Sequence, residues 1–156
     1  MSLFDKIFKK KFEGNSRELD RTSEEYKSNI RAATAALLVL MAHADDSFSE
    51  VEYQKISAVL KKKFNLSEGQ VDELLEECKS HVYPEEQVQT TLKFIDKNFY
   101  FDEKYDLMKN LYAVMLADSD LSTMEMKLFT KISAALGINK IALATIRTDV
   151  ERELNS

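Results

Sequence analysis

The sequence is poor in the residues that interrupt helices. It contains three glycines and one proline among 156 residues. It also lacks any stretch in which apolar and polar residues alternate with the period of two that marks a half-buried strand. Helix-forming residues such as Ala, Leu, Lys and Glu are abundant instead. These absences argue against a β-rich chain and predict an all-α fold, a compact bundle of seven or eight helices.

Cysteine and long apolar runs are also scarce. Cys78 is the single cysteine, so no intramolecular disulfide can form, and a reducing, cytoplasmic compartment is the simplest assumption. The longest apolar run, residues 32–44, is shorter than the ~20 residues that a membrane span needs. The N-terminus has too short an apolar core for a signal peptide. Because the apolar run of residues 32–44 is too short to span a membrane, it predicts a helix that is buried on most sides.

Positive charge is in deficit over the whole chain. The net charge of −5 argues against non-specific nucleic-acid binding, which needs a basic field, so we expect no nucleic-acid partner. Residues 3–12 are the exception, because apolar residues recur there at helical spacing among lysines. They predict a basic amphipathic segment that contacts a membrane surface or folds back on the body. A polar linker follows, so we expect a segment over 1–22 and a helical domain over 23–156.

One nine-residue pattern occurs twice in the sequence. Residues 44–52 read ADDSFSEVE, and residues 117–125 read ADSDLSTME. Each copy follows an apolar run. A similar segment comes after each copy, KISAVL at 55–60 and KISAAL at 131–136. The distance from the motif to this segment differs between the two copies by about one helical turn. Self-similarity of this kind indicates a duplicated structural unit, which predicts that residues 35–66 and 108–138 superpose.

Start and stop signals divide the chain into helices. Ser67 with Gln70 has the capping-box signature, Asp102 can cap the following helix, Asn139 can cap the last, and Gly137 suits a helix end. We expect inward-facing apolar residues in each helix, and they are Tyr26, Ile30, Ala33, Leu37, Leu40, Met41, Val51, Ile56, Val59, Leu60, Phe64, Val71, Leu74, Leu75, Cys78, Val88, Leu92, Ile95, Phe99, Tyr105, Met108, Leu111, Tyr112, Met115, Leu128, Phe129, Ile132, Leu136, Ala142, Leu143, Ile146 and Val150.

The repeated motif has two explanations. Ser49 with Glu52, and Ser122 with Glu125, can form capping boxes in which the hydroxyl and the carboxylate each satisfy a backbone N–H. The aspartates are harder to explain, since a carboxylate at the end of a helix is unfavourable by ~0.3–1 kcal/mol. The positive start of the following helix or a bound cation would compensate. An EF-hand is excluded, because copy two lacks the central glycine and the glutamate at loop position twelve.

The pattern Ala-Asp-(Gly)-x-(aromatic or aliphatic)-Ser-x-x-Glu, present twice in a small helical chain, resembles the tellurite-resistance TerB family. The opening MSLFDK is also similar to the start of a TerB chain. The resemblance implies a compact helical fold with an internal repeat. It also implies a divalent-metal site at the acidic motif residues, and association at the inner membrane with an integral membrane partner of the TerC type in a stress response. The matching positions are Asp45 and Glu52 in copy one and Asp118 and Glu125 in copy two.

The chain departs from the family where glycine usually follows the first aspartate, since it has Asp46 and Ser119 there. Asp46 and Asp120 add carboxylates to the two copies. Clustered carboxylates suit calcium, magnesium or manganese, which prefer oxygen ligands. The candidate metal ligands are therefore Asp45, Asp46, Glu52, Asp118, Asp120 and Glu125.

Other candidate sites are weaker. Cys78 and His81 lie one turn apart, but structural zinc takes four ligands, so packing explains the thiol better. His43 lies next to the first motif and could modulate it with pH, although an incidental surface position explains it more simply. The chain has no glycine-rich phosphate loop and no nucleophile signature. We therefore expect a non-enzymatic protein, either a metal-responsive adaptor or a purely structural protein–protein interaction domain.

Overall fold

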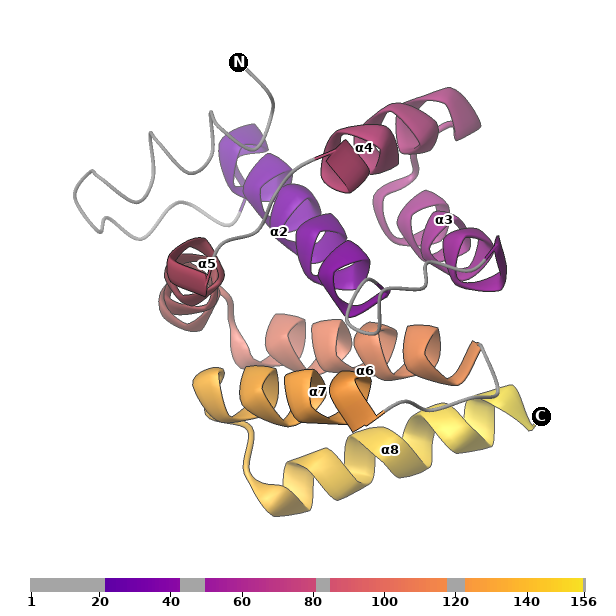
Figure 1. Cartoon of the computed structure of the whole chain (residues 1–156). Coiled ribbons are helices and arrows are strands. Elements are labelled where there is room, and N and C mark those ends of the chain that lie inside the picture. Colours follow the sequence, from indigo (N-terminus) through magenta and orange to yellow (C-terminus); the bar gives the residue numbers. More distant parts are fainter. Residues whose placement is uncertain (1–21, 43–49, 81–84, 118–122, 156) are drawn as a thin grey trace.

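The computed structural model describes residues 22–42, 50–80, 85–117 and 123–155, and these residues form helices without any strand (Figure 1). The all-α prediction is confirmed. The described part of the chain contains seven helices, namely α2 (Glu24–Ala42), α3 (Glu50–Phe64), α4 (Glu68–Ser80), α5 (Glu85–Asn98), α6 (Phe101–Ala117), α7 (Thr123–Ala135) and α8 (Lys140–Leu154).

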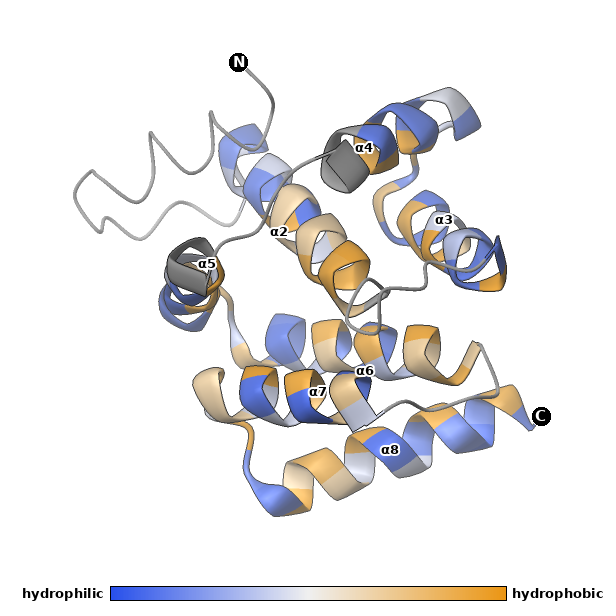
Figure 2. Ribbon diagram, in the orientation of Figure 1, coloured by the Kyte–Doolittle hydropathy of each residue, from blue (hydrophilic) through white to orange (hydrophobic). Residues whose placement is uncertain are grey.

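Helix α2 is the most buried element. Every residue from 32 to 39 is buried, so this part of the apolar run is covered on all sides as the sequence predicts. Helices α3, α4, α6 and α7 all pack against α2. Figure 2 shows that hydropathy also changes along this helix, with hydrophilic residues in the first turns of α2 and apolar residues in the later turns. None of the described helices is long and apolar enough to cross a bilayer.

The helices fall into two similar groups of three. Helix α2 contacts α3 and α4, and in the same way α6 contacts α7 and α8. Helices α2 and α6 also pack against each other, and each motif-bearing helix, α3 or α7, contacts both of them. The two groups differ in one respect, because α3 also packs against α4, whereas α7 and α8 are not among the helix pairs in extensive contact. The superposition of residues 35–66 on residues 108–138 stays a prediction.

Several helix ends follow the predicted chemistry. Ser67 N–H donates to Gln70 Oε1 at 2.9 Å and Gln70 N–H donates to Ser67 Oγ at 3.2 Å, so the capping box of α4 is confirmed. Asn139 caps α8, since its side chain accepts from Ala142 N–H at 2.8 Å. Gly137 ends α7 with a φ of 71°, and the bond from Ile138 N–H to Ser133 O at 2.9 Å completes a Schellman motif.

The start of α6 differs from the prediction. The helix begins at Phe101, so Asp102 lies inside the first turn and does not cap it. Tyr100 is the residue before the helix, and its N–H donates to Glu103 Oε1 at 2.9 Å. The prediction that Asp102 caps this helix was wrong. Glu103, three residues after Tyr100, reaches back to the Tyr100 N–H and supplies the carboxylate half of a capping box.

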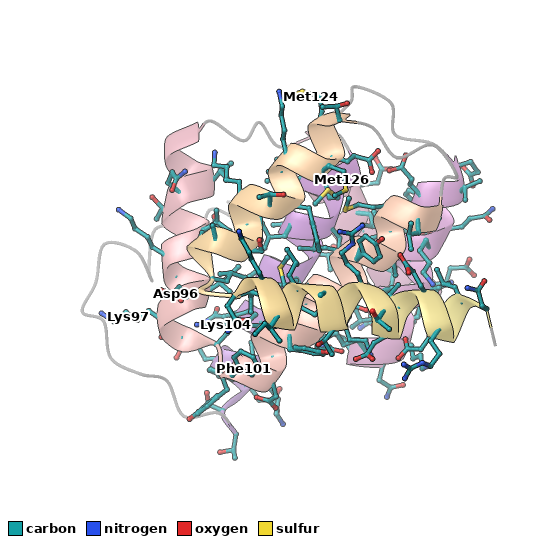
Figure 3. The ribbon with its side chains drawn as sticks, turned by 90° about the horizontal axis from the view of Figure 1, so that it is seen from below. Asp96, Lys97, Phe101, Lys104, Met124 and Met126 are labelled. Atoms are coloured by element: carbon teal, nitrogen blue, oxygen red, sulfur yellow. The ribbon has the colours of Figure 1, made fainter. Side chains whose placement is uncertain are left out.

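Polar contacts hold the last helix in place. Tyr105 donates to Asp149 Oδ2 at 2.9 Å, and Lys109 Nζ lies 2.7 Å from Glu153 Oε1. Because the partners advance in the same direction along both helices, α6 and α8 run parallel, as Figure 1 shows. A further pair, Lys104 Nζ and Asp96 Oδ1 at 2.8 Å, joins α6 to α5 (Figure 3).

Candidate functional site

Glu52 and Glu125 are the two candidate metal ligands within the described residues, and both are buried. Glu52 lies in the first turn of α3 with 1% of its surface exposed, and Glu125 lies in the first turn of α7 with 2% exposed. Buried glutamates are rare in proteins unless they are paired, hydrogen-bonded or bound to a metal. The two copies of the motif therefore place the same residue type in the same unusual environment.

Each glutamate begins the buried face of its helix. In α3, Glu52 is followed at intervals of four residues by the buried Ile56 and Leu60. In α7, Glu125 is followed in the same register by Phe129 and Ser133, which are buried as well. Residues four apart lie on one side of a helix, so both carboxylates point in the same direction as the core residues that follow them.

The prediction that Val51 faces inward was wrong. Val51 is 52% exposed, whereas its neighbour Glu52 is 1% exposed. Ile56 lies five positions after Val51, about 140° away around the helix axis, but only four positions after Glu52, about 40° away. Hydropathy alone favoured the valine, while the spacing from Ile56 and Leu60 indicated the glutamate.

A buried carboxylate in the first turn of a helix experiences opposing effects. The partial positive charge at a helix start favours an anion there by ~0.3–1 kcal/mol, or up to ~2 kcal/mol when partly buried. Removal of an ionised carboxylate from water costs more than this unless hydrogen bonds or a cation compensate. Both explanations of the motif, a capping box and a cation site, supply such compensation. The burial of Glu52 and Glu125 thus makes their partners important for stability.

The remaining candidate ligands and caps of the motif lie outside the described part of the chain. This applies to the candidate ligands Asp45, Asp46, Asp118 and Asp120 and to the predicted caps Ser49 and Ser122, as well as to His43 and His81. Within the described residues alone, no group of three or more His, Cys, Asp or Glu side chains comes together. The oxygen donors of the motif match the chemistry of a hard divalent cation.

A family model described as tellurite resistance protein TerB matches residues 31–148. The chain belongs to the TerB family. The matched range covers most of the chain and contains both copies of the acidic motif, and residues 3–12 lie before it. No match was found among curated proteins or among solved structures.

The structure also groups lysines that the sequence did not bring together. A cleft of about 510 Å³ lies between α3 and α8 over the surface of α6, and its cationic lining comprises Lys55, Lys62, Lys63 and Lys109. Two of these are paired across the cleft, Lys63 with Asp106 and Lys109 with Glu153. From the sequence alone, Lys61, Lys62 and Lys63 are most simply interpreted as a solvated helix end, where cations are favoured. The spacing of Lys55 and Lys62, two helical turns apart, was the signal for a shared face.

Proposed function

We propose that this TerB-family chain is a non-enzymatic, cytoplasmic stress-response protein. It binds a divalent cation, calcium, magnesium or manganese, at its two acidic motifs. It then acts as an adaptor near the inner membrane, where an integral protein of the TerC type is its partner. The observation that carries the proposal is the burial of Glu52 and Glu125 at corresponding positions in α3 and α7.

The chemistry of the motif residues supports a hard cation. Glu52 and Glu125 supply anionic oxygens that are shielded from water, and Asp45, Asp46, Asp118 and Asp120 are adjacent in sequence to the same helix starts. A bound cation would supply the positive charge that buried carboxylates require. Cation binding would then be coupled to the stability of the fold, because unfolding separates the ligands.

A capping role alone is the competing explanation, and substitutions separate the two. Glutamine is accepted at the third position of a capping box, whereas a hard-cation site depends on anionic oxygens. Glu52→Gln and Glu125→Gln should therefore abolish cation-dependent stabilisation if the motif binds a metal. Asp45→Asn and Asp118→Asn should have the same effect.

The readout is thermal and denaturant unfolding with and without calcium, magnesium or manganese. A cation at about a hundred times its dissociation constant stabilises the fold by ~2.7 kcal/mol. Ser49→Ala and Ser122→Ala are the matched controls, since each removes a cap worth ~0.5–2 kcal/mol and retains the carboxylates. If millimolar cations leave the unfolding of the wild-type protein unchanged, the metal-binding role is wrong and the interaction-domain role remains.

The membrane contact rests on residues 3–12. Their apolar residues and lysines suit an anionic surface, at roughly 1 kcal/mol for each basic residue near it. Flotation with anionic liposomes at low and high salt measures this contact. We expect flotation that salt weakens and that deletion of residues 1–13 abolishes; flotation that survives the deletion would show that another surface binds the membrane.

A further inference from the structure

Two aromatic residues lie next to each other on the surface where α5 is followed by α6. Tyr100 is 50% exposed and Phe101 is 61% exposed. Among the large apolar residues that are exposed in the described part of the chain, they are the only two that are consecutive in the sequence. Single exposed apolar residues are ordinary, whereas neighbouring ones suit contact with an apolar partner. We call this pair the aromatic corner.

Hydrogen bonds fix the backbone of the aromatic corner. Tyr100 N–H donates to Glu103 Oε1 at 2.9 Å, and Tyr100 O accepts from the N–H of Lys104 at 3.0 Å. Figure 3 shows Phe101 near one edge of the molecule and Met124 near the opposite edge. The rings are therefore held by a rigid turn at the periphery of the fold, where a flat or fluid surface can reach them.

The charges around the aromatic corner are balanced, although the whole chain has a net charge of −5. Residues 88–105 contain three lysines and three carboxylates, namely Lys93, Lys97, Lys104, Asp96, Asp102 and Glu103. One pair of them, Lys104 Nζ and Asp96 Oδ1, is 2.8 Å apart. An anionic lipid surface would therefore not be repelled here as it would be by the chain as a whole.

The start of α2 lies beside the aromatic corner. Tyr26 OH lies 3.1 Å from the carbonyl oxygen of Asn98 and 2.5 Å from Glu103 Oε1. The basic amphipathic residues 3–12 precede α2 in the sequence, and the nine residues 13–21 between them can span at most ~30 Å. Residues 3–12 are thus tethered to the same side of the molecule as the two exposed rings.

We propose that Tyr100 and Phe101 insert into the lipid surface as a second membrane contact. The inference rests on the membrane contact of residues 3–12 proposed above. The lysines of that segment supply attraction to anionic lipid, and the rings supply apolar burial; stable attachment takes two such signals. Aromatic side chains suit the boundary between lipid tails and head groups, where the tyrosine hydroxyl stays hydrated.

The two contacts reinforce each other because they belong to one chain. Once residues 3–12 are bound, insertion of the rings is an intramolecular step, so the overall affinity exceeds that of either contact. Two rings are too few to hold the protein alone. The pair of contacts also fixes the orientation of the molecule, with the α5–α6 turn towards the lipid and the start of α7 away from it.

A tryptophan reporter tests the insertion. The chain contains no tryptophan, so Phe101→Trp in the full-length protein gives a single fluorescent indole at the aromatic corner. Vesicles of phosphatidylcholine and phosphatidylglycerol should move its emission to shorter wavelengths, and brominated lipid tails should quench it. Met124→Trp is the matched control, because Met124 is 54% exposed and lies at the opposite edge of the molecule (Figure 3). Its emission should stay unchanged.

Removal of both rings supplies a second test. In the Tyr100→Ser/Phe101→Ser variant, the serine at position 100 and Glu103 complete a capping box, so the start of α6 is retained. Vesicle binding should weaken about tenfold or more, because the apolar surface of two rings is no longer buried. The loss should be the same at low and high salt, since the rings carry no charge. Met124→Ser should bind as the wild type does.

The outcomes separate this inference from the membrane contact of residues 3–12. If the wild-type protein does not bind vesicles, both are wrong. If it binds, but the emission of Phe101→Trp does not move and loss of the rings has no effect, the inference alone is overturned. Equal shifts in Phe101→Trp and Met124→Trp would contradict a fixed orientation. A shift that follows protein concentration without vesicles would assign the aromatic corner to self-association instead.

Discussion

Ser67 and Gln70 hydrogen-bond to each other's backbone N–H groups at the start of α4, at 2.9 and 3.2 Å. This box uses an uncharged amide where the repeated motifs have glutamate. Gln70 is exposed, whereas Glu52 and Glu125 are buried. A helix of this protein is therefore capped without a carboxylate, so the burial of two carboxylates at the other helix starts calls for an explanation beyond capping.

The box at α4 provides an internal reference for the motif experiments. Ser67→Ala should lower the free energy of unfolding by ~0.5–2 kcal/mol, and Gln70→Glu should change it little, because both residues accept the same backbone hydrogen bond. Neither effect should depend on divalent cations. Urea unfolding with and without millimolar calcium measures both; a cation-dependent change in the Gln70→Glu variant would mean that any added carboxylate produces the signal expected for Glu52.

Two glycines should respond to alanine with opposite signs. Gly137 has a φ of 71°, so Gly137→Ala should destabilise the protein by ~1–2 kcal/mol. Gly69 lies inside α4 with no neighbouring atom within 4 Å of an added Cβ, so Gly69→Ala should stabilise it by up to ~1 kcal/mol. Thermal unfolding of the two variants tests the pair, and equal effects would contradict the helix ends described above.

Phe129 should be a major contributor to the core around the second motif. It is 1% exposed, and its ring centroid lies 5.5 Å from that of Tyr112. Phe129→Ala should therefore cost ~3–5 kcal/mol. Met124, at the outer end of α7 (Figure 3), is 54% exposed, so Met124→Ala should change stability by less than ~0.5 kcal/mol. Denaturant unfolding gives both values; similar losses in the two variants would mean that α7 packs through another face.

Alkaline unfolding should depend on Tyr105. Partial burial raises the pKa of Tyr105, and its hydrogen bond to Asp149 raises this pKa further. The folded state thus favours the neutral phenol, and this contribution is complete below the unfolded pKa of ~10 and is lost as the pH rises through the higher folded pKa.

Tyr105→Phe should consequently make stability fall less steeply above pH ~10. Some dependence of stability on pH should remain, because the hydrogen bond to Glu153 raises the pKa of Lys109, and the stability that this provides is also lost as the pH rises. Urea unfolding from pH 8 to pH 11 measures the slope, with the half-exposed Tyr100→Phe as control. An unchanged slope in Tyr105→Phe would contradict the assigned hydrogen bond.

The sequence by itself determined the features that depend on neighbouring residues. Helix type follows from the scarcity of Gly and Pro and from apolar spacing. The ends of α4, α7 and α8 follow from Ser67 with Gln70, from Gly137 and from Asn139, because a cap is a contact between residues at most a few positions apart. The family also followed from local pattern, since the two acidic motifs lie within the matched residues 31–148.

Only the tertiary structure decided which side of each helix is buried when hydropathy and spacing disagree. Glu52 faces inward and Val51 outward because α3 packs against α2 and α6 at once, and the packed face extends from Ile56 and Leu60 back to the first turn. The cleft with Lys55, Lys62 and Lys109 is likewise made by three helices, α3, α6 and α8, that are distant in sequence. Burial and cavities are properties of packed surfaces, so they depend on contacts that no single stretch of sequence contains.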